Sequence, residues 1–220
     1  MSLTELEREI VSCRACPRLV EWRKRVAREK RAAYASESYW GKPLPGFGDP
    51  EAKVVVLGLA PAAHGANRTG RVFTGDRSGE FLYAGLYRAG FASSPLSRRR
   101  GDGLELYGAW ISAAVRCAPP QNKPTPAERD ACLPYLAREL ELLRRARVIL
   151  CLGSFAWDAA LRLYDVRPRR KFGHGAEYEV EDGPVLLGCY HVSQQNTFTG
   201  RLTPAMLDAV LARARDLGKC

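Results

Sequence analysis

The sequence predicts an α/β fold, a sandwich of helices around a mostly parallel central sheet, on three observations. Four apolar runs of strand length are spaced along the chain. These runs are continuous rather than alternating, which is typical of parallel strands buried on both faces. Helical patterns lie between and after them, and strands that alternate with helices indicate an α/β arrangement. We expect a single domain over residues 1–220, because this length and an apolar content of 46% can supply one sizeable core.

The expected elements follow in chain order. The strands are KVVVLGL at 53–59, AWISAAV at 109–115, ARVILCLG at 146–153 and PVLLGCY at 184–190. Helices are expected at 78–90, 125–146, 153–165 and 203–217, two of which open with Thr-Pro, a threonine cap followed by proline at the first helical position. In open α/β sheets ligands bind beyond the carboxyl ends of the strands. A site is therefore expected in the loops that begin at Leu59, Arg116 and His191.

The charge of the chain favours a polyanionic partner. Its 34 basic and 24 acidic side chains give a formal net charge of +10, and such an excess is typical of nucleic-acid binding. An Arg-rich coding bias explains the same excess. No apolar run approaches the roughly 20 residues of a membrane span, and the charged, amphipathic start MSLTELEREI does not resemble an export signal. We therefore expect a cytoplasmic protein that does not bind membranes.

The seven cysteines divide into expected metal ligands and core residues. Cys13 and Cys16 form a C-x-x-C pair, and Cys117 and Cys132 stand further along the chain with fourteen residues between them. Four thiolates can bind zinc or an iron-sulfur cluster. Such a site would fix the N-terminal segment, residues 1–50, to the rest of the domain. Three cysteines are left out of the site, namely Cys151 and Cys189 as core residues inside apolar strands and Cys220 as part of a frayed terminus.

Two long loops carry unusual combinations of glycine and polar residues. GLAPAAHGANRTG from Gly58 lacks the spacing of nucleotide-binding loops. Together with RVFTGD, VRCAPPQNKPTPAE, HVSQQNTFTGRL and the four cysteines, it closely resembles family five uracil-DNA glycosylases, over residues 13 to about 203. The resemblance implies a three-layer α/β/α sandwich around a four-stranded, mostly parallel sheet, a [4Fe-4S] cluster, and excision of uracil and other deaminated or modified bases from DNA. We expect a monomer.

Two residues are expected to carry the chemistry. Breaking the bond between base and sugar places negative charge on the base and positive charge on the sugar, so a hydrogen-bond donor and a carboxylate both help. The resemblance implies that His191 donates to O2 of the base and that Asp76 positions water or stabilises the sugar cation. Asp76 also precedes an expected helix, so a capping role is the alternative. Neither catalytic motif contains a lysine able to form a Schiff base, which predicts a monofunctional enzyme.

The expected substrate pocket departs from better-known branches of the superfamily. Phe73 matches the aromatic residue that stacks on the extruded base, although a buried core phenylalanine is the alternative. Ala62 and Ala63 stand near the position of a water-handling acid or amide, and Ala113 stands where an asparagine reads uracil. A pocket tolerant of several bases is therefore expected. Asn122 is either a partial replacement for that reader or a turn residue. The predicted substrate-binding residues are Phe73, Asn122, Ala62 and Gly58.

A base-flipping enzyme also needs groups that hold DNA phosphates and groups that fill the vacated stack. The predicted phosphate contacts are Ser193, Gly65 and Gly200. Gln194, Gln195 and Asn196 are expected to enter the minor groove. Basic surface is expected from Arg68, Arg71 and Arg201 and, with less support because a charge run is usually a solvated face, from Arg98, Arg99 and Arg100. The rival hypotheses are a DNA-binding module with a cluster but no catalysis, and the same enzyme with zinc in place of the cluster.

Overall fold

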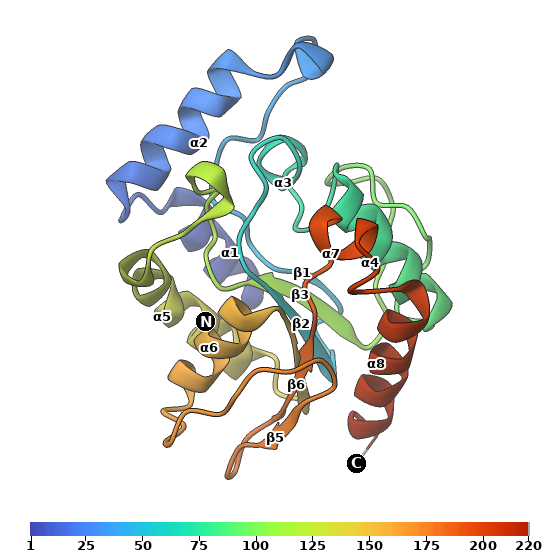
Figure 1. The fold of residues 1–220 in the computed structure, drawn as a ribbon. Coiled ribbons are helices and arrows are strands. Elements are labelled where there is room, and N and C mark those ends of the chain that lie inside the picture. The colour runs from blue at the N-terminus through green and yellow to red at the C-terminus, as the bar shows by residue number, and fades with distance from the viewer. Residues whose placement is uncertain (220) are drawn as a thin grey trace.

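A mixed six-stranded sheet forms the centre of the protein, which a computed structural model describes over residues 1–219 (Figure 1). The strand order is β1-β3-β2-β4-β6-β5. The four inner strands are parallel and fully or largely buried, namely β3 (Ala109–Ala113), β2 (Val54–Gly58), β4 (Val148–Leu152) and β6 (Val185–Cys189). The four predicted strands and their parallel pairing are confirmed.

Two edge strands make the sheet larger than the four strands expected. β1 (Phe47–Gly48) pairs antiparallel with β3, and β5 (Glu177–Glu179) pairs antiparallel with β6. The expected strand number was wrong because neither segment contains an apolar run. β1 lies in the irregular stretch before the first long strand, and β5 reads Glu-Tyr-Glu with both glutamates exposed. Short polar edge strands are weak signals in a sequence.

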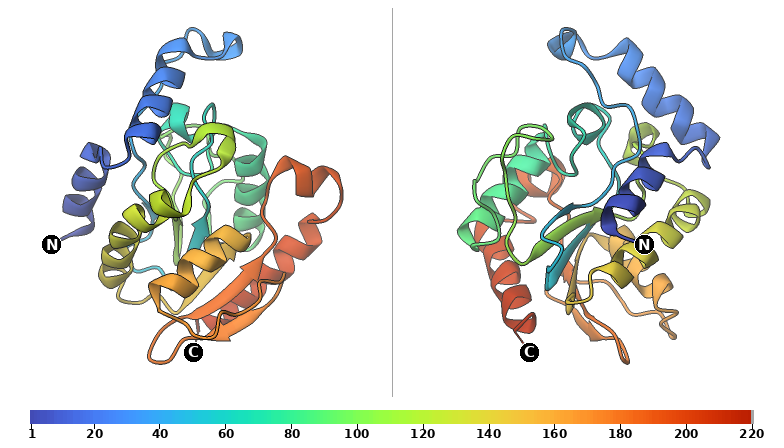
Figure 2. Two further views of the ribbon diagram at one scale, coloured as in Figure 1. Left: turned by 60° about the vertical axis from the view of Figure 1, so that its left-hand side comes forward. Right: turned by 180° about the vertical axis from the view of Figure 1, so that it is seen from behind.

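Helices cover both faces of the sheet and complete three layers (Figures 1 and 2). On one face lie α4 (Arg77–Arg88) and α8 (Pro204–Leu217), whose Leu82, Leu86 and Leu207 pack in one apolar cluster with the sheet. On the other face lie α5 (Pro126–Leu142) and α6 (Ser154–Leu163), which pack through a second cluster. The predicted Thr-Pro starts are confirmed, since both threonine side chains, of Thr125 and Thr203, accept a backbone hydrogen bond at the helix start.

The N-terminal segment packs against this sandwich. α1 (Leu3–Ser12) contacts α5, and α2 (Pro17–Glu29) contacts the short helix α3 (Ala66–Thr69). Figure 2 shows α2 and the 3-10 turn η1 (Ala32–Tyr34) projecting beyond the sheet. Arg23 on α2 is buried, and it donates to the carbonyl oxygens of Cys13 and Gly41.

Short elements occupy the loops at the carboxyl ends of the parallel strands. They are α3, the 3-10 turn η2 (Pro120–Asn122) and α7 (Gln194–Phe198). Cys151 and Cys189 are buried in the two main clusters, as predicted, while Cys220 lies outside the described residues. Across residues 1–219, no helix combines the length and apolar character that a membrane span requires.

Candidate active site

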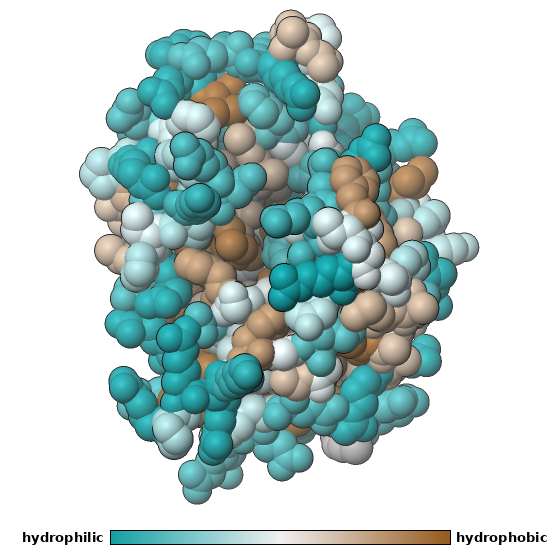
Figure 3. Space-filling model, in the orientation of Figure 1, coloured by the Kyte–Doolittle hydropathy of each residue, from teal (hydrophilic) through white to brown (hydrophobic). Residues whose placement is uncertain are grey.

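A cavity of about 260 Å³ lies at the carboxyl ends of β2, β3 and β6. Figure 3 shows this face, with recessed apolar residues edged by hydrophilic side chains. The lining comes from three separate parts of the chain, namely Gly58, Leu59, Ala60, Pro61, Ala62, Ala66, Val72, Phe73, Asp76 and Ser78 from the first long loop, Ala113 and Asn122 from β3 and η2, and His191 and Ser193 after β6. The fold thus brings both predicted catalytic residues and all four predicted substrate-binding residues to one cavity.

Asp76 caps a helix and faces the cavity at the same time. Its Oδ1 accepts a hydrogen bond of 2.9 Å from the Gly79 amide, which makes it the N-cap of α4. Its Oδ2 lies against Gly65, where an added Cβ would stand only 2.2 Å away. Oδ2 makes no hydrogen bond within residues 1–219. One carboxylate oxygen is therefore fixed by the helix start and the other is left for a ligand.

His191 reaches the cavity from the end of β6. Burial lowers the pKa of its imidazole, and the negative charge of Asp76 acts in the opposite direction. The side chain is therefore neutral at pH 7. Its ring nitrogens make no hydrogen bond with any residue of 1–219, while its backbone oxygen accepts one of 2.8 Å from Asn196 Nδ2. A fixed backbone and a free ring suit a donor to a bound base.

Phe73 forms one wall of the cavity in an unusual backbone conformation. Its φ is +51°, which is rare for an aromatic residue and indicates local strain. Its ring lies 6.2 Å from the His191 ring, centre to centre, at 43°. A Cβ at Gly58 would stand 2.6 Å from the Phe73 ring. Gly58 thus contributes by leaving space for this ring at the end of β2.

The remaining polar lining is sparse. Asn122 has a left-handed φ of +56°, so it is a turn residue, and it also lines the cavity with an amide that makes no side-chain hydrogen bond within residues 1–219. Ala62 and Ala113 contribute no polar group to the wall. Ser78, which the sequence did not single out, adds a hydroxyl near the start of α4. A mostly apolar pocket with a few polar groups is typical of small-molecule recognition.

The loop after His191 is more ordered than expected, because it contains α7. Ser193 caps this helix, and its hydroxyl accepts from the Asn196 amide at 3.4 Å. Gln194 and Gln195 are exposed. The Asn196 side chain instead turns inward to the His191 carbonyl. Asn196 therefore holds the backbone of the loop that follows β6, and its amide is not directed outward as those of Gln194 and Gln195 are.

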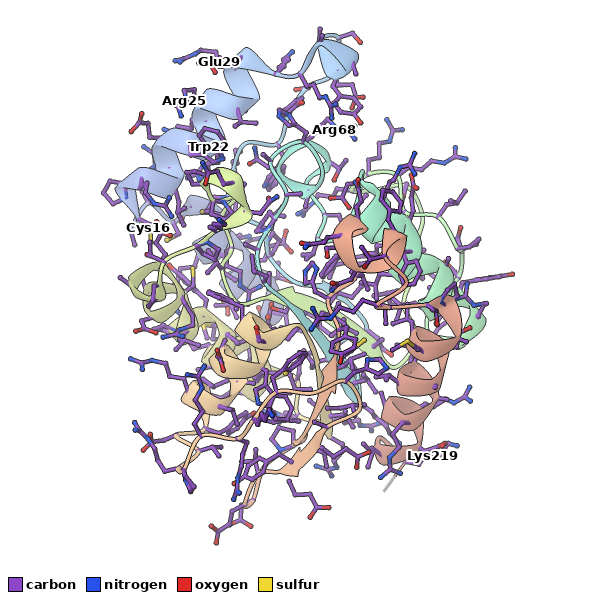
Figure 4. All side chains as sticks on the ribbon, viewed as in Figure 1. Cys16, Trp22, Arg25, Glu29, Arg68 and Lys219 are labelled. Carbon is purple, nitrogen blue, oxygen red and sulfur yellow. The ribbon has the colours of Figure 1, made fainter. Side chains whose placement is uncertain are left out.

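Several arginines expected on a DNA surface are engaged within the protein. Arg71 is buried and forms an ion pair of 2.7 Å with Asp102. Arg68 pairs with Glu37 and donates to the carbonyl oxygens of His64 and Gly75. Figure 4 shows Arg68 beside α3, toward the N-terminal segment. The buried position of Arg71 is incompatible with the expected basic surface, and the internal partners of Arg68 make it a weak phosphate ligand.

In the basic run, Arg100 forms an ion pair with Glu7, and the backbone amides of Arg98 and Arg99 donate to Asp102.

Two other arginines near the cavity have exposed side chains without an ion pair in residues 1–219. Arg201 is exposed, lies over the Tyr190 ring and forms no ion pair with residues 1–219. Arg77, which directly follows Asp76, is also exposed and without an ion pair in that range. Only tertiary structure could identify Arg77, because the sequence offers many isolated arginines.

The four predicted ligand cysteines lie in one region of the protein. Cys16, Cys117 and Cys132 belong to one small apolar cluster, and Figure 4 shows Cys16 at the start of α2. Burial raises the pKa of the Cys117 thiol to about 12, with further contributions from Cys132 and Cys13, while Arg23 acts in the opposite direction. The thiols are thus close enough to influence one another. As placed, no three His, Cys, Asp or Glu side chains of residues 1–219 form a group able to hold a metal ion.

Comparisons with known proteins agree with this geometry. A family model described as the uracil DNA glycosylase superfamily matches residues 45–215. A type-5 uracil-DNA glycosylase of Mycobacterium tuberculosis is 56% identical over 219 residues, 98% of this chain and 82% of the relative. One of Thermus thermophilus is 53% identical over 209 residues, 94% of each chain. A type-4 uracil-DNA glycosylase of Archaeoglobus fulgidus is 32% identical over 185 residues, 82% of this chain and 74% of the relative. The chain therefore belongs to the uracil-DNA glycosylase superfamily and, within it, to the type-5 family.

Proposed function

We propose that this protein is a monofunctional DNA glycosylase that hydrolyses the bond between uracil and deoxyribose and leaves an abasic site for base excision repair. The observation that carries the proposal is the cavity in which Asp76, His191 and Phe73 meet. Its 260 Å³ suits a single extruded base. The lining contains no lysine among residues 1–219, which supports hydrolysis rather than Schiff-base chemistry.

His191 supplies the leaving-group side of the reaction. As the bond breaks, the electron pair moves onto the base and negative charge develops on its oxygens. A neutral imidazole N–H directed into an apolar cavity stabilises that charge more than water does, because the surrounding dielectric is low. Phe73 beside His191 provides a flat face on which the base can stack. The donor and the stacking face together hold the base in one orientation.

Asp76 supplies the sugar side. Its free Oδ2 accepts a hydrogen bond from the attacking water, while the negative charge stabilises the cationic sugar. Asp76→Asn separates these contributions, since the amide oxygen still accepts a hydrogen bond but the charge is gone. A loss of activity in Asp76→Asn as large as in Asp76→Ala indicates charge stabilisation. A much smaller loss indicates water positioning.

The shape of the pocket favours a broad range of bases. Ala62, Ala66 and Ala113 leave space where longer side chains would exclude substituents. The free amide of Asn122 both donates and accepts, so it can meet different base edges. We therefore propose that uracil, hydroxymethyluracil and hypoxanthine are all excised. A panel of oligonucleotides with one lesion each tests this range.

The four cysteines are proposed to hold a [4Fe-4S] cluster, with zinc as the alternative. Two of these thiols come from the N-terminal segment, and Cys117 and Cys132 come from the region after β3 and from α5. Cys117 and Cys132 are buried, and burial raises the pKa of both thiols, a shift that Arg23 at Cys117 and Arg116 at Cys132 partly oppose. When bound, the group would serve as a structural crosslink between these segments. Visible absorbance with iron and sulfide analysis distinguishes a cluster from a colourless zinc site.

We further propose that the protein acts as a cytoplasmic monomer. Free thiols that bind metal persist in a reducing compartment. Sedimentation of the purified protein tests the monomer.

Excision of uracil from a defined oligonucleotide tests the proposed activity directly. The expected product is an abasic site that alkali converts to a strand break, whereas DNA without uracil stays intact. His191→Ala and Asp76→Asn should bind the same DNA but excise slowly. If the wild-type protein bound uracil-containing DNA and released no base at high enzyme concentration, the rival hypothesis of a binding module without catalysis would replace this one.

A further inference from the structure

Phe198 is the most exposed large apolar side chain of residues 1–219. It is 67% exposed, and the other exposed large apolar side chains in this range are 48–60% exposed. Phe198 belongs to none of the three apolar clusters of the core. A single exposed aromatic residue is common on protein surfaces. Its meaning therefore depends on where it lies.

Phe198 lies on the outer face of α7, beside the cavity. Ser193, which caps the start of the helix, lines the cavity, and Asn196 and Thr197 are only partly exposed on the inner side of the helix. Gln194, Gln195 and Phe198 are exposed, and their spacing of three and four residues places them on one face. α7 therefore presents one aromatic ring and two amides outward at the entrance of the site.

Arg77 connects Phe198 to the segment that carries Asp76. The Arg77 guanidinium carbon lies 5.6 Å from the centre of the Phe198 ring, and Arg77 directly follows Asp76. Figure 1 shows α7 beside the start of α4. At the end of the loop that carries Phe198, the Arg201 guanidinium carbon lies 4.8 Å from the centre of the Tyr190 ring. Neither arginine has an ion-pair partner in residues 1–219, so both charges remain available to phosphates.

We propose that Phe198, supported by Arg77, is the wedge that enters the DNA base stack when a nucleotide leaves it for the cavity. The inference rests on the proposed excision from duplex DNA. A flipped nucleotide leaves an apolar gap, and a phenylalanine ring can stack on the flanking bases as an amide cannot. The amides of Gln194 and Gln195 then lie at the edges of the gap, where hydrogen bonding to bases or sugars is possible.

The proposal is tested by separating extrusion from bond cleavage. Phe198→Ala, Phe198→Trp and the control Tyr107→Ala are compared on a paired duplex with one uracil and on a duplex whose uracil lies in an unpaired bubble. Tyr107 is 51% exposed and directly precedes β3, at the opposite end of that strand from the cavity. Phe198→Ala should lower single-turnover excision from the paired duplex roughly 10- to 100-fold and excision from the bubble less than about 3-fold.

The other two variants serve as a rescue and as a control. Phe198→Trp should restore excision from the duplex, and Tyr107→Ala should change neither substrate. With 2-aminopurine placed next to the uracil, binding should unstack the probe in the wild type and much less in Phe198→Ala. Equal losses on both substrates, or no loss on the duplex, would overturn the wedge assignment. If the wild type excised uracil from neither substrate, the proposed function itself would fail.

The role of Arg77 in phosphate binding is tested by the salt dependence of DNA affinity. Replacing one phosphate-binding arginine reduces the slope of log affinity against log salt concentration by about 1. Arg77→Ala should show this reduction on duplex DNA, whereas Arg213→Ala, far along the chain on α8, should not. An unchanged slope in Arg77→Ala would overturn the supporting role given to Arg77.

Discussion

Replacing Gly65 with alanine should disable Asp76 without touching the carboxylate itself. The backbone of Gly65 has a φ of −96°, outside the left-handed region, and the part of an alanine that acts on Asp76 is its Cβ. The added Cβ would stand 2.2 Å from Asp76 Oδ2, whereas ordinary contact begins at 3.4 Å. The carboxylate must therefore move by about 1 Å, the difference between these two distances.

Two consequences of this displacement can be measured. A misplacement of about 1 Å at a reacting centre costs on the order of 100-fold in rate. Moving the carboxylate also weakens the cap on Gly79, which is worth about 1 kcal/mol, so the unfolding midpoint should fall by roughly 2–4 °C. Single-turnover excision of uracil with excess enzyme measures the first effect, and thermal unfolding measures the second.

Two controls test whether the effect passes through Asp76. Gly173→Ala should leave the rate unchanged, because its added Cβ would stand 3.5 Å from the nearest atom. In an Asp76→Ala background, Gly65→Ala should cost almost nothing more, since the clashing carboxylate is gone. If the two substitutions instead reduced the rate additively, or if Gly65→Ala were fully active, the steric reasoning would be refuted.

Three further predictions concern residues around the site. Asn196→Ala removes the hydrogen bond to the His191 carbonyl and should slow excision roughly 2- to 10-fold in the single-turnover assay, whereas Tyr107→Ala, at the end of β3 far from the cavity, should not. Glu139→Ala leaves Arg116 buried and unpaired and should destabilise the protein by about 3–5 kcal/mol in urea unfolding. Burial lowers the folded-state pKa of His191 below its unfolded value of about 6.5. Between these two pKa values the unfolded chain binds more protons than the folded one, so the free energy of unfolding decreases as the pH falls below about 6.5. His191→Gln should show a smaller decrease in urea midpoint between pH 7.5 and 5.

The central fold could be predicted because its signals are local and long enough. Each inner strand is a continuous run of five residues, buried or nearly so, and apolar runs of this length between helical patterns are typical of parallel strands. Thr125 and Thr203 fix two helix starts through side-chain hydrogen bonds that their sequence context already indicates. The sequence signals for a strand buried on both faces and for a helix cap each lie within a few consecutive residues, so a single sequence is enough to predict these features.

The missed elements are short. α3 has four residues and α7 has five, about one turn each, so neither can show helical periodicity. The consequence for function is greatest at Asn196, which the linear sequence groups with Gln194 and Gln195. Helical geometry turns Asn196 inward to His191 while the two glutamines stay outside.

The sequence alone could not show which arginines are buried in ion pairs and which are exposed on the surface. Arg71 finds Asp102, and Arg116 finds Glu139, at separations in sequence where no local pattern operates. Both arginines are buried and contribute nothing to surface potential, whereas Arg77 and Arg201 remain exposed. The net charge of +10 therefore says less about DNA contact than the few arginines beside the cavity do.

The two roles that the sequence allowed for Asp76 turn out to depend on each other. A carboxylate has two oxygens, and the Gly79 amide binds only one of them. That bond fixes the side-chain torsion, and the absence of a Cβ at Gly65 leaves room for the second oxygen. A group held before the substrate arrives need not reorganise during the reaction, which is the main source of electrostatic stabilisation in enzymes. Asn196 holds His191 through its backbone in the same way. In both cases a hydrogen bond at a helix start holds the proposed catalytic group in place, so for Asp76 the capping role and the proposed catalytic role are compatible.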